Sequence, residues 1–346
     1  MARKKVLLLG GAGFIGTFLA RFLLRERDHE ITIADTVWVR DLDEHFSAEQ
    51  KANITFIDAD FLDPAAFDLL QDDYDYVYML ASVVGVNPTL EHPEEVIRIN
   101  TTLITNTLAW LRTSSVGKVL FCSSSECYAG TTQAFDYPVP TGEEVPLCID
   151  DITHPRWTYA VTKMLGESAF LNSGPKYGFD ACVVRYQNAF GPDMGFKHAI
   201  PHIIERFYKG ESPVRIFGTD QTRAFCYITD SAEGTVLAME SDAANGEVFH
   251  IGSMVEISMD TLTRAVGKIV GYTGEYVDEE TYPGSVARRC PDISKARRLL
   301  DYEPKVHWEE GLRRTVAWYL EFFGAGKVPS SGGFEPPENF KPQRKG

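Results

Sequence analysis

Tyr159 and Lys163 stand four residues apart, a spacing that places both side chains on one face of a helix. A phenol, with a pKa of about 10, is a weak base at neutral pH. A lysine cation beside it would stabilise the phenolate, which could then take a proton from a substrate hydroxyl. The pair therefore predicts general-base chemistry at Tyr159.

A glycine-rich turn near the start of the chain predicts where a cofactor binds. Residues 6–9 are apolar and typical of a strand buried on both faces, and helical periodicity follows over residues 17–24. In a dinucleotide-binding turn one glycine allows the tight turn, a second lets the backbone approach a pyrophosphate, and a third allows close packing. The helix N-terminus then binds the phosphates. The residues expected to do this are Gly10, Gly13, Phe14, Ile15 and Gly16.

Asp35 supports this prediction. It ends a second apolar strand, residues 30–35, at about 20 residues after the glycines, where the ribose of a dinucleotide lies. A carboxylate there accepts hydrogen bonds from a free 2′-hydroxyl group and repels a 2′-phosphate. We therefore expect NAD, not NADP, as the cofactor.

Strand and helix signals alternate through the first half of the chain, which predicts an α/β fold with a Rossmann-type doubly wound parallel sheet. Ligands bind at the carboxyl ends of such strands. We expect further cofactor contacts from Asp60, Phe61, Leu80, Ala81 and Ser82, and chemistry from residues 123–126. Predicted strands 53–57, 74–80, 117–122 and 181–186 alternate with predicted helices 64–70, 93–111 and 156–172, and residues 129–155 are predicted to be a loop.

The second half of the chain is more irregular and predicts a smaller C-terminal lobe that binds substrate. We assign residues 1–190, with parts of 220–255, to the nucleotide-binding domain and residues 191–323 mainly to the substrate lobe. Residues 324–346 are polar and rich in glycine and proline, and we expect a disordered tail.

Charge and composition narrow the class of protein. A formal net charge of -15 argues against sequence-independent binding to nucleic acid or to an anionic membrane, because both require a basic surface. No apolar run is long enough to span a bilayer and no secretory signal fits, so we expect a cytoplasmic protein. The six cysteines lack metal-type spacing and the histidines form no paired motif, so we expect no metal.

Several further motifs accompany the glycine turn and the Tyr159–Lys163 pair. They are Ser123-Ser124-Ser125-Glu126-Cys127-Tyr128, Arg185-x-x-Asn188-x-x-Gly191-Pro192, residues 221–230 and residues 291–296. Together they resemble the extended short-chain dehydrogenase/reductases, specifically the NAD-dependent epimerase/dehydratases that act on nucleotide sugars. The resemblance covers residues 5–323. It implies a nucleotide-diphosphate sugar as substrate.

The resemblance also implies roles for single residues. Ser124 corresponds to the hydroxyl that bonds the reacting sugar oxygen beside Tyr159, and Asp60 to the acid that contacts adenine. An arginine fork suits a diphosphate because it offers bidentate, charge-assisted hydrogen bonds. The positions that match substrate contacts are Asn188 and Arg223, with Arg289 as a candidate addition. Family members commonly dimerise through helices equivalent to residues 93–111 and 156–172, so we expect a homodimer.

Glu126 is the residue that bears most on the reaction. Members of the family first oxidise the sugar, usually at C4, and the ketone makes the C3 and C5 hydrogens acidic and a C5 carboxylate labile. Simple 4-epimerases often have a small residue at this position. A carboxylate there is similar to that of GDP-mannose-type 4,6-dehydratases and UDP-glucuronate decarboxylases, where it works at or near C5. Alternatively, Glu126 only orders the loop or binds a ribose.

Other residues favour different reactions. Lys197 stands near the general acid of GDP-mannose 3,5-epimerases, and Ser125 replaces the aspartate acid of glucose 4,6-dehydratases; we expect both to contact substrate. Pro155-Arg156-Trp157 is similar to the decarboxylase half of a bacterial lipid A-modifying enzyme. Our first prediction is an epimerase that works through a 4-keto sugar, with Glu126 as a candidate C5 acid or base. A UDP-glucuronate decarboxylase or a 4,6-dehydratase is the alternative, and a non-catalytic NAD-binding regulator is a weaker one.

Overall fold

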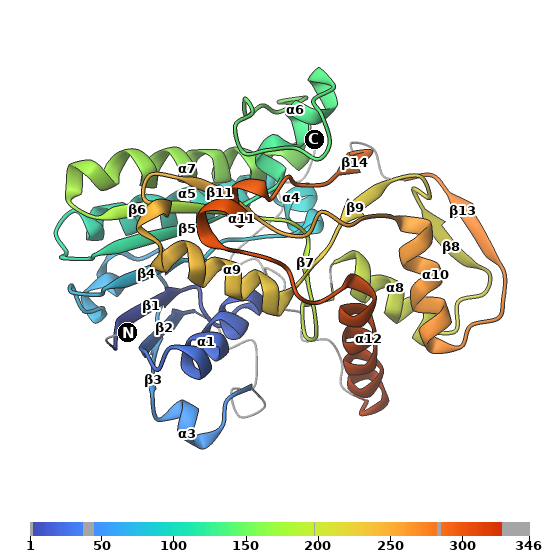
Figure 1. Cartoon of the computed structure of the whole chain (residues 1–346), viewed down its shortest axis with the longest axis horizontal. Helices are drawn as coiled ribbons and strands as arrows, with labels where there is room; N and C mark the ends of the chain where they lie inside the picture. Colours follow the sequence, from blue (N-terminus) through green and yellow to red (C-terminus); the bar gives the residue numbers. More distant parts are fainter. Residues whose placement is uncertain (1–2, 37–44, 197, 282–284, 327–346) are drawn as a thin grey trace, which may run out of the picture.

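The computed structural model describes residues 3–36, 45–196, 198–281 and 285–326. At the centre of these residues is a seven-stranded parallel sheet with the order β11-β6-β5-β4-β1-β2-β3 (Figure 1). The predicted Rossmann-type sheet is therefore confirmed, and the strand order reverses between β1 and β4, where α/β sheets bind ligands. The strands are β1 (Lys5–Leu9), β2 (Glu30–Asp35), β3 (Ile54–Asp58), β4 (Tyr76–Met79), β5 (Lys118–Ser124), β6 (Asp180–Tyr186) and β11 (Val248–Ile251).

Helices cover both faces of the sheet. On one face lie α5 (Pro93–Leu111) and α7 (Thr158–Tyr177), and on the other lie α1 (Phe14–Glu26) and α9 (Ile228–Glu240) (Figure 1). Successive side chains of a strand point to opposite faces, and both faces of a parallel sheet are buried. In β1, alternate residues accordingly join the two hydrophobic cores, one beneath α1 and α9 and the other beneath α5 and α7. This is why residues 6–9 are all apolar.

A third hydrophobic core lies beside the large sheet. It joins side chains of α8 (Ala199–Tyr208), α10 (Met259–Val270) and α12 (Trp308–Gly324). Small sheets accompany it, in the orders β10-β7, β12-β9-β14 and β13-β8. Their strands are β7 (Ala189–Phe190), β8 (Val214–Phe217), β9 (Thr222–Ala224), β10 (Cys226–Tyr227), β12 (Glu256–Ser258), β13 (Tyr276–Glu279) and β14 (Arg288–Arg289). That this part forms a substrate lobe stays a prediction.

The predicted loop over residues 129–155 is wrong in its first part. Glu126–Phe135 forms the helix α6, which packs on the chain that returns after it: a Cβ added at Gly130 would lie 2.5 Å from the carbonyl oxygen of Cys148. Tertiary packing thus stabilises a helix with little periodicity of its own. The remaining elements are α3 (Ala48–Lys51), η1 (Pro64–Leu69), α4 (Val86–Glu91), η2 (Pro155–Trp157), η3 (Asp242–Ala244) and α11 (Ser294–Leu300).

Two predictions fall wholly or partly outside the described residues. Lys197 is one, and residues 327–346 of the predicted tail are the other; its first residue, Gly324, ends α12. In the described part of the chain, no helix combines the length and the apolar character needed to cross a membrane. The same residues contain no cluster of three or more histidine, cysteine, aspartate or glutamate side chains that could hold a metal ion.

Candidate functional site

The glycine turn has the shape that a pyrophosphate requires. Gly10 has a positive φ of 83°, and a Cβ there would lie 2.4 Å from the Ala81 backbone. A Cβ at Gly16 would lie 2.4 Å from the Gly11 oxygen, so this glycine lets α1 pack on the turn itself. Gly13 differs, because its Cβ would meet only the Gly10 oxygen, at 3.7 Å, and it begins α1 without a side-chain cap. The first N–H groups of α1 therefore suit the phosphates of a dinucleotide.

Asp35 lies beside this turn, at the carboxyl end of β2. One carboxylate oxygen accepts a hydrogen bond from the Ala12 N–H at 3.0 Å and the other accepts one from the Thr36 N–H at 2.9 Å. These bonds fix the carboxylate next to the glycine turn, where the ribose is expected. Its cofactor role stays a prediction, and the geometry fits it.

The other predicted cofactor residues lie at the ends of neighbouring strands. The N–H groups of Leu80 and Ala81 both donate to the Leu9 oxygen, at 2.9 Å, which holds the chain after β4 against the turn after β1. Ser82 is partly buried in the same segment and donates to its neighbour's carbonyl. Asp60 is exposed, whereas the ring of Phe61 is buried against Phe67, so only the backbone of Phe61 is placed to meet a cofactor.

The predicted catalytic pair lies where α7 passes the end of β5. Lys163 is buried, its Nζ donates to the carbonyl oxygen of Cys122 at 2.9 Å, and it lies 5.6 Å from the centre of the Tyr159 ring. Burial lowers the pKa of Lys163 to about 8. Burial also raises the pKa of Tyr159, with smaller contributions in the same direction from Cys127 and Glu126, while a hydrogen bond with Ser124 acts in the opposite direction. In this environment the positive charge of the nicotinamide ring of NAD, when bound, would favour the phenolate form of Tyr159.

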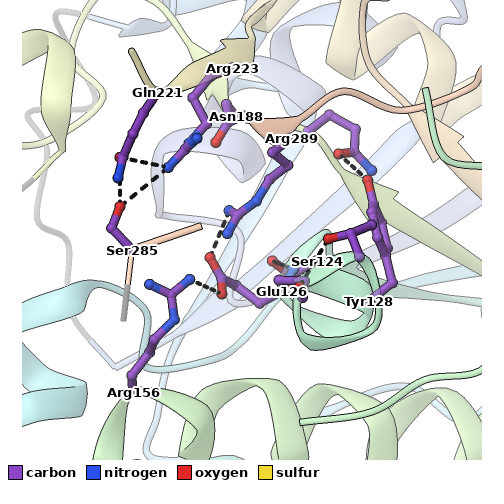
Figure 2. Close-up of polar contacts among 12 residues, drawn as sticks. Ser124, Glu126, Tyr128, Arg156, Asn188, Gln221, Arg223, Ser285 and Arg289 are labelled. Atoms are coloured by element: carbon purple, nitrogen blue, oxygen red, sulfur yellow. Dashed lines mark hydrogen bonds and ion pairs between the residues drawn. The ribbon is translucent and has the colours of Figure 1, made fainter. Parts of the chain in front are cut away.

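Glu126 lies between two arginines (Figure 2). Its Oε1 accepts a hydrogen bond from Arg289 Nη1 at 2.7 Å, and its Oε2 accepts one from Arg156 Nη2 at 3.0 Å. Its own N–H donates to Ser124 Oγ at 3.2 Å, which ties it to the end of β5. Burial alone would raise the pKa of Glu126, but Arg289 and Arg156 together hold it below its usual range. The carboxylate is therefore ionised at neutral pH.

Arg223 is the third arginine of the cluster and is paired in register with Arg289 between β9 and β14. Its guanidinium points away from Glu126 and contacts Gln221, Ser285 and two backbone carbonyls (Figure 2). Burial and the neighbouring charge of Arg289 lower the pKa of Arg223 to about 9. The arginine cluster, defined here as Arg156, Arg223 and Arg289 with Glu126, thus combines three guanidinium groups with one carboxylate, which two of them bind.

Unused hydrogen-bond donors in this arginine cluster indicate a ligand. The Nε atoms of Arg156 and Arg289 are buried, and neither finds a partner among the residues that the structure describes. Buried donors are normally satisfied, so donors left over beside surplus positive charge suit an anion. The structure brings Arg223 and Arg289 together, and their contacts with substrate stay a prediction.

The remaining residues predicted to contact substrate form no hydrogen bond with the arginine side chains of the cluster in the described part of the chain. Asn188 has a positive φ of 43° and its Nδ2 donates to the Ala224 oxygen at 2.8 Å, so here its amide holds β9. Ser125 is buried and begins α6, next to Glu126. The contact predicted for Lys197 lies outside the described residues.

The sequence analysis did not predict a role for two residues of the site. Arg156 was seen only as part of a motif, although its position three residues before Tyr159 is a usable signal. Asn100 is buried in α5, accepts from the Val83 N–H at 2.8 Å and donates to Thr162 Oγ1 at 3.2 Å. It thereby joins the chain after β4 to α7. Because α5 contains a second asparagine, Asn106, an amide in this helix was not a distinctive signal.

Comparison with known proteins adds a family and several relatives. A model of the NAD-dependent epimerase/dehydratase family matches residues 6–252. A UDP-N-acetyl-alpha-D-glucosaminuronate decarboxylase from Bacillus cytotoxicus is 32% identical over 330 residues, which cover 92% of this chain and 98% of the relative. A UDP-glucuronate 4-epimerase from Thermodesulfobacterium geofontis is 30% identical over 325 residues, covering 91% of this chain and 96% of the relative.

A solved structure is also similar. The UDP-glucuronic acid 4-epimerase from Bacillus cereus, in complex with UDP-glucuronic acid and NAD, superposes with a TM-score of 0.79. It is 27% identical, and the match covers 92% of this chain and 99% of that one. The relatives named here are thus one decarboxylase and two 4-epimerases.

Proposed function

The chain belongs to the NAD-dependent epimerase/dehydratase family, and from this membership and the arginine cluster we propose that it decarboxylates a UDP-linked uronic acid through a transient 4-keto sugar. The observation that carries the proposal is Glu126, held ionised between Arg156 and Arg289 beside two unused buried donors. NAD, when bound, supplies reversible hydride acceptance at the sugar carbon.

The charge of the cluster supports an anionic substrate. Two guanidinium groups bind the one carboxylate and a third, that of Arg223, lies in the adjoining strand, so the cluster carries surplus positive charge inside the protein. A diphosphate neutralises that surplus through charge-assisted hydrogen bonds, and a uronate adds a further negative group. The relatives named above act on UDP-linked uronates, according to their names, which favours this class over neutral sugars.

The residues around Tyr159 support the first oxidation. We assign Tyr159 the role of base that removes the proton of the C4 hydroxyl as the C4 hydride leaves. Lys163 lies beside the ring and stabilises the phenolate, and Ser124, which hydrogen-bonds Tyr159, orients the reacting oxygen. Tyr159 and Lys163 belong to α7 and Ser124 ends β5, so all three residues are held by regular elements of the fold.

Decarboxylation follows from the ketone. With a carbonyl at C4, the C5 carboxylate is that of a β-keto acid: its bond to C5 breaks, carbon dioxide leaves, and the electron pair moves to the C4 oxygen as an enolate. C5 then takes a proton from solvent, and when C4 is reduced again its oxygen takes back the proton held by Tyr159. An ionised Glu126 donates no proton at neutral pH, and a fixed carboxylate beside the site disfavours the charged substrate group relative to neutral carbon dioxide.

A second candidate is C4 epimerisation of the same uronate; the sequence predicted an epimerase that works through a 4-keto sugar, without identifying the sugar or the carbon that is inverted. The T. geofontis relative and the B. cereus structure favour it. Here the hydride returns to the opposite face of C4 and no bond to C5 changes. Glu126 then serves only to hold the arginines.

Mass spectrometry of products formed in deuterated water separates these reactions. The protein with NAD is incubated with UDP-glucuronate and UDP-N-acetylglucosaminuronate, with UDP-glucose and UDP-N-acetylglucosamine as neutral controls. We expect loss of carbon dioxide and gain of a solvent deuterium. An isobaric product without deuterium would contradict decarboxylation and support the 4-epimerase reaction. Turnover of neutral sugars alone would reject the uronate. Tyr159→Phe, which should bind NAD without turnover, excludes a non-catalytic regulator.

We also propose that the chain forms a homodimer through α5 and α7. These long helices lie side by side on one face of the sheet (Figure 1). Ile97 of α5 and Val161 and Leu165 of α7 are exposed apolar residues, as a helix-to-helix contact between two copies would require. Size-exclusion chromatography with light scattering should give twice the chain mass, and Leu165→Glu should reduce it to one chain. A wild-type monomer contradicts the proposal.

A further inference from the structure

The two carboxylate oxygens of Glu126 have separate partners from separate parts of the fold. Arg289 Nη1 binds Oε1 at 2.7 Å and comes from β14, whereas Arg156 Nη2 binds Oε2 at 3.0 Å and comes from η2. Figure 2 shows the two arginines reaching Glu126 from opposite sides. Either arginine can therefore leave without displacing the other.

Arg289 is the one placed to leave. It is paired with Arg223 across β14 and β9, so these two guanidinium groups form the natural site for the diphosphate of the proposed substrate. Its buried Nε has no partner within the described ranges, so turning toward an anion would satisfy a donor that is unused now. Glu126 Oε1 would then lose its hydrogen bond.

Arg156 is the one placed to stay. Its guanidinium lies over the ring of Trp157, 5.0 Å from the ring centre, and that ring is itself buried. The η2 turn that holds both residues continues directly into α7, the helix of Tyr159 and Lys163. Arg156 is thus fixed to the catalytic helix, whereas Arg289 is fixed to the part of the site expected to meet the diphosphate.

We propose that Arg156 is a positioning residue that keeps Glu126 ionised and in place while Arg289 exchanges Glu126 for an anionic group of the substrate. A partly buried carboxylate that lost all its partners would take up a proton or turn away. Arg156 prevents both, because it binds the oxygen that Arg289 does not touch. The proposal rests on the proposed function for the identity of the anion, a UDP diphosphate.

The first test compares Arg156→Gln and Arg156→Lys with wild type, over a range of pH. Arg156→Gln should lower kcat by roughly 10- to 100-fold, the loss expected when a buried charge loses its hydrogen-bond partner, with little change in KM. The acid limb of the kcat profile should move to higher pH, because Glu126 then gains a proton more easily. Arg156→Lys keeps the charge and should restore part of both effects. The matched control is Arg264→Gln, which removes an arginine paired with Asp260 on the outer face of α10.

A double-mutant cycle with Glu126→Gln tests whether Arg156 acts through Glu126. When Glu126→Gln is already present, adding Arg156→Gln should cost less than about threefold in kcat. The proposal is overturned if Arg156→Gln costs the same with and without Glu126→Gln, or if the acid limb stays where it is.

Unfolding measurements with UDP keep the proposal testable without turnover. The unfolding midpoints of wild type, Arg156→Gln, Glu126→Gln and the double variant are measured with and without saturating UDP. The coupling between Arg156 and Glu126 should grow when UDP is bound, because Arg289 no longer shares the carboxylate. A coupling that UDP leaves unchanged overturns the exchange. If wild type turns over no UDP-uronate but this coupling grows, the proposed function fails and the exchange stands.

Discussion

Two glutamate–arginine groups contact the last residues of β5, and they differ in how fully their polar atoms are bonded. Glu167 accepts two hydrogen bonds from Arg185, at 2.8 and 2.7 Å, and one from the Ser123 hydroxyl at 2.5 Å. The remaining guanidinium nitrogen of Arg185 donates to the Glu143 carbonyl at 3.2 Å. Glu126 receives a single nitrogen from each of two arginines, whose Nε atoms find no partner in the described chain.

This difference separates a structural ion pair from a binding site. The Glu167–Arg185 pair is buried and bidentate, with its charges matched one to one, and each nitrogen of the guanidinium has a partner, so it carries no surplus charge for a ligand. The cluster around Glu126 keeps unused donors and surplus positive charge, which cost stability unless an anion completes them. Residue types alone do not distinguish the two groups, but the count of satisfied atoms does.

The largest expected effect is on stability, at the saturated pair. Glu167→Gln leaves the Arg185 charge buried and unpaired, and should lower the free energy of unfolding by about 3–5 kcal/mol. Glu126→Gln should lower it by less than about 1 kcal/mol, because that site is partly open and already carries unmatched charge. Urea denaturation of both variants without ligands measures this. Equal losses would erase the distinction between the two groups.

The next effect is on activity, at the unsaturated cluster. Glu126→Gln should lower kcat for the UDP-uronate by about 100-fold, since a neutral amide does not provide the fixed charge. UDP should bind at least as tightly as in wild type, because Arg289 is no longer held by a carboxylate. Isothermal titration with UDP and a stopped assay of product measure the two quantities. Weaker UDP binding in this variant would show that Glu126 organises the arginines instead of competing for them.

The parts of the site that the sequence predicts well are those built from neighbours in the chain. Gly10 and Gly13 follow a strand directly, and their roles depend on a turn only a few residues long. Tyr159 and Lys163 are one helical turn apart, so their approach follows from helix geometry alone. Asp35 was predicted because it ends the next strand at about 20 residues after the glycines, and in the structure β1 and β2 are neighbours in the sheet.

The parts that the sequence does not predict are assembled from distant segments. Glu126 meets Arg289 across 163 positions in sequence and Arg156 across 30, and nothing local indicates which arginine binds which oxygen. The same applies to α6, whose residues from 129 on were predicted as loop. Packing against residues 148–150 stabilises this helix, and that contact is not visible in the local sequence. The motif that contains Arg185 was recognised in the sequence, but only the fold shows that the Arg185 guanidinium forms an ion pair with Glu167.

A smaller effect should appear in the salt dependence of UDP binding. Surplus arginine charge attracts the diphosphate through interactions that salt screens, so UDP affinity should fall several-fold as salt rises from about 0.05 to 0.5 M. Arg289→Gln should flatten this dependence, because it removes one charge of the cluster. Arg297→Gln, which breaks an exposed pair with Glu303, is the control and should leave the slope unchanged. Equal salt dependence of UDP affinity in wild type and Arg289→Gln would show that Arg289 does not contribute to diphosphate binding.

The smallest effect is the pH dependence of stability that Glu126 contributes. Arg289 and Arg156 outweigh burial and hold the pKa of Glu126 below its ordinary value of about 4.3. The ionised form therefore stabilises the folded state above about pH 4.3, and this contribution is lost as the pH falls through the lower pKa of the folded state. The difference in unfolding free energy between wild type and Glu126→Gln should stay constant above about pH 5 and shrink below it. Urea denaturation at a series of pH values measures this difference. A difference that grows on acidification would mean that Glu126 is protonated more easily in the folded protein, and that the arginines do not hold it.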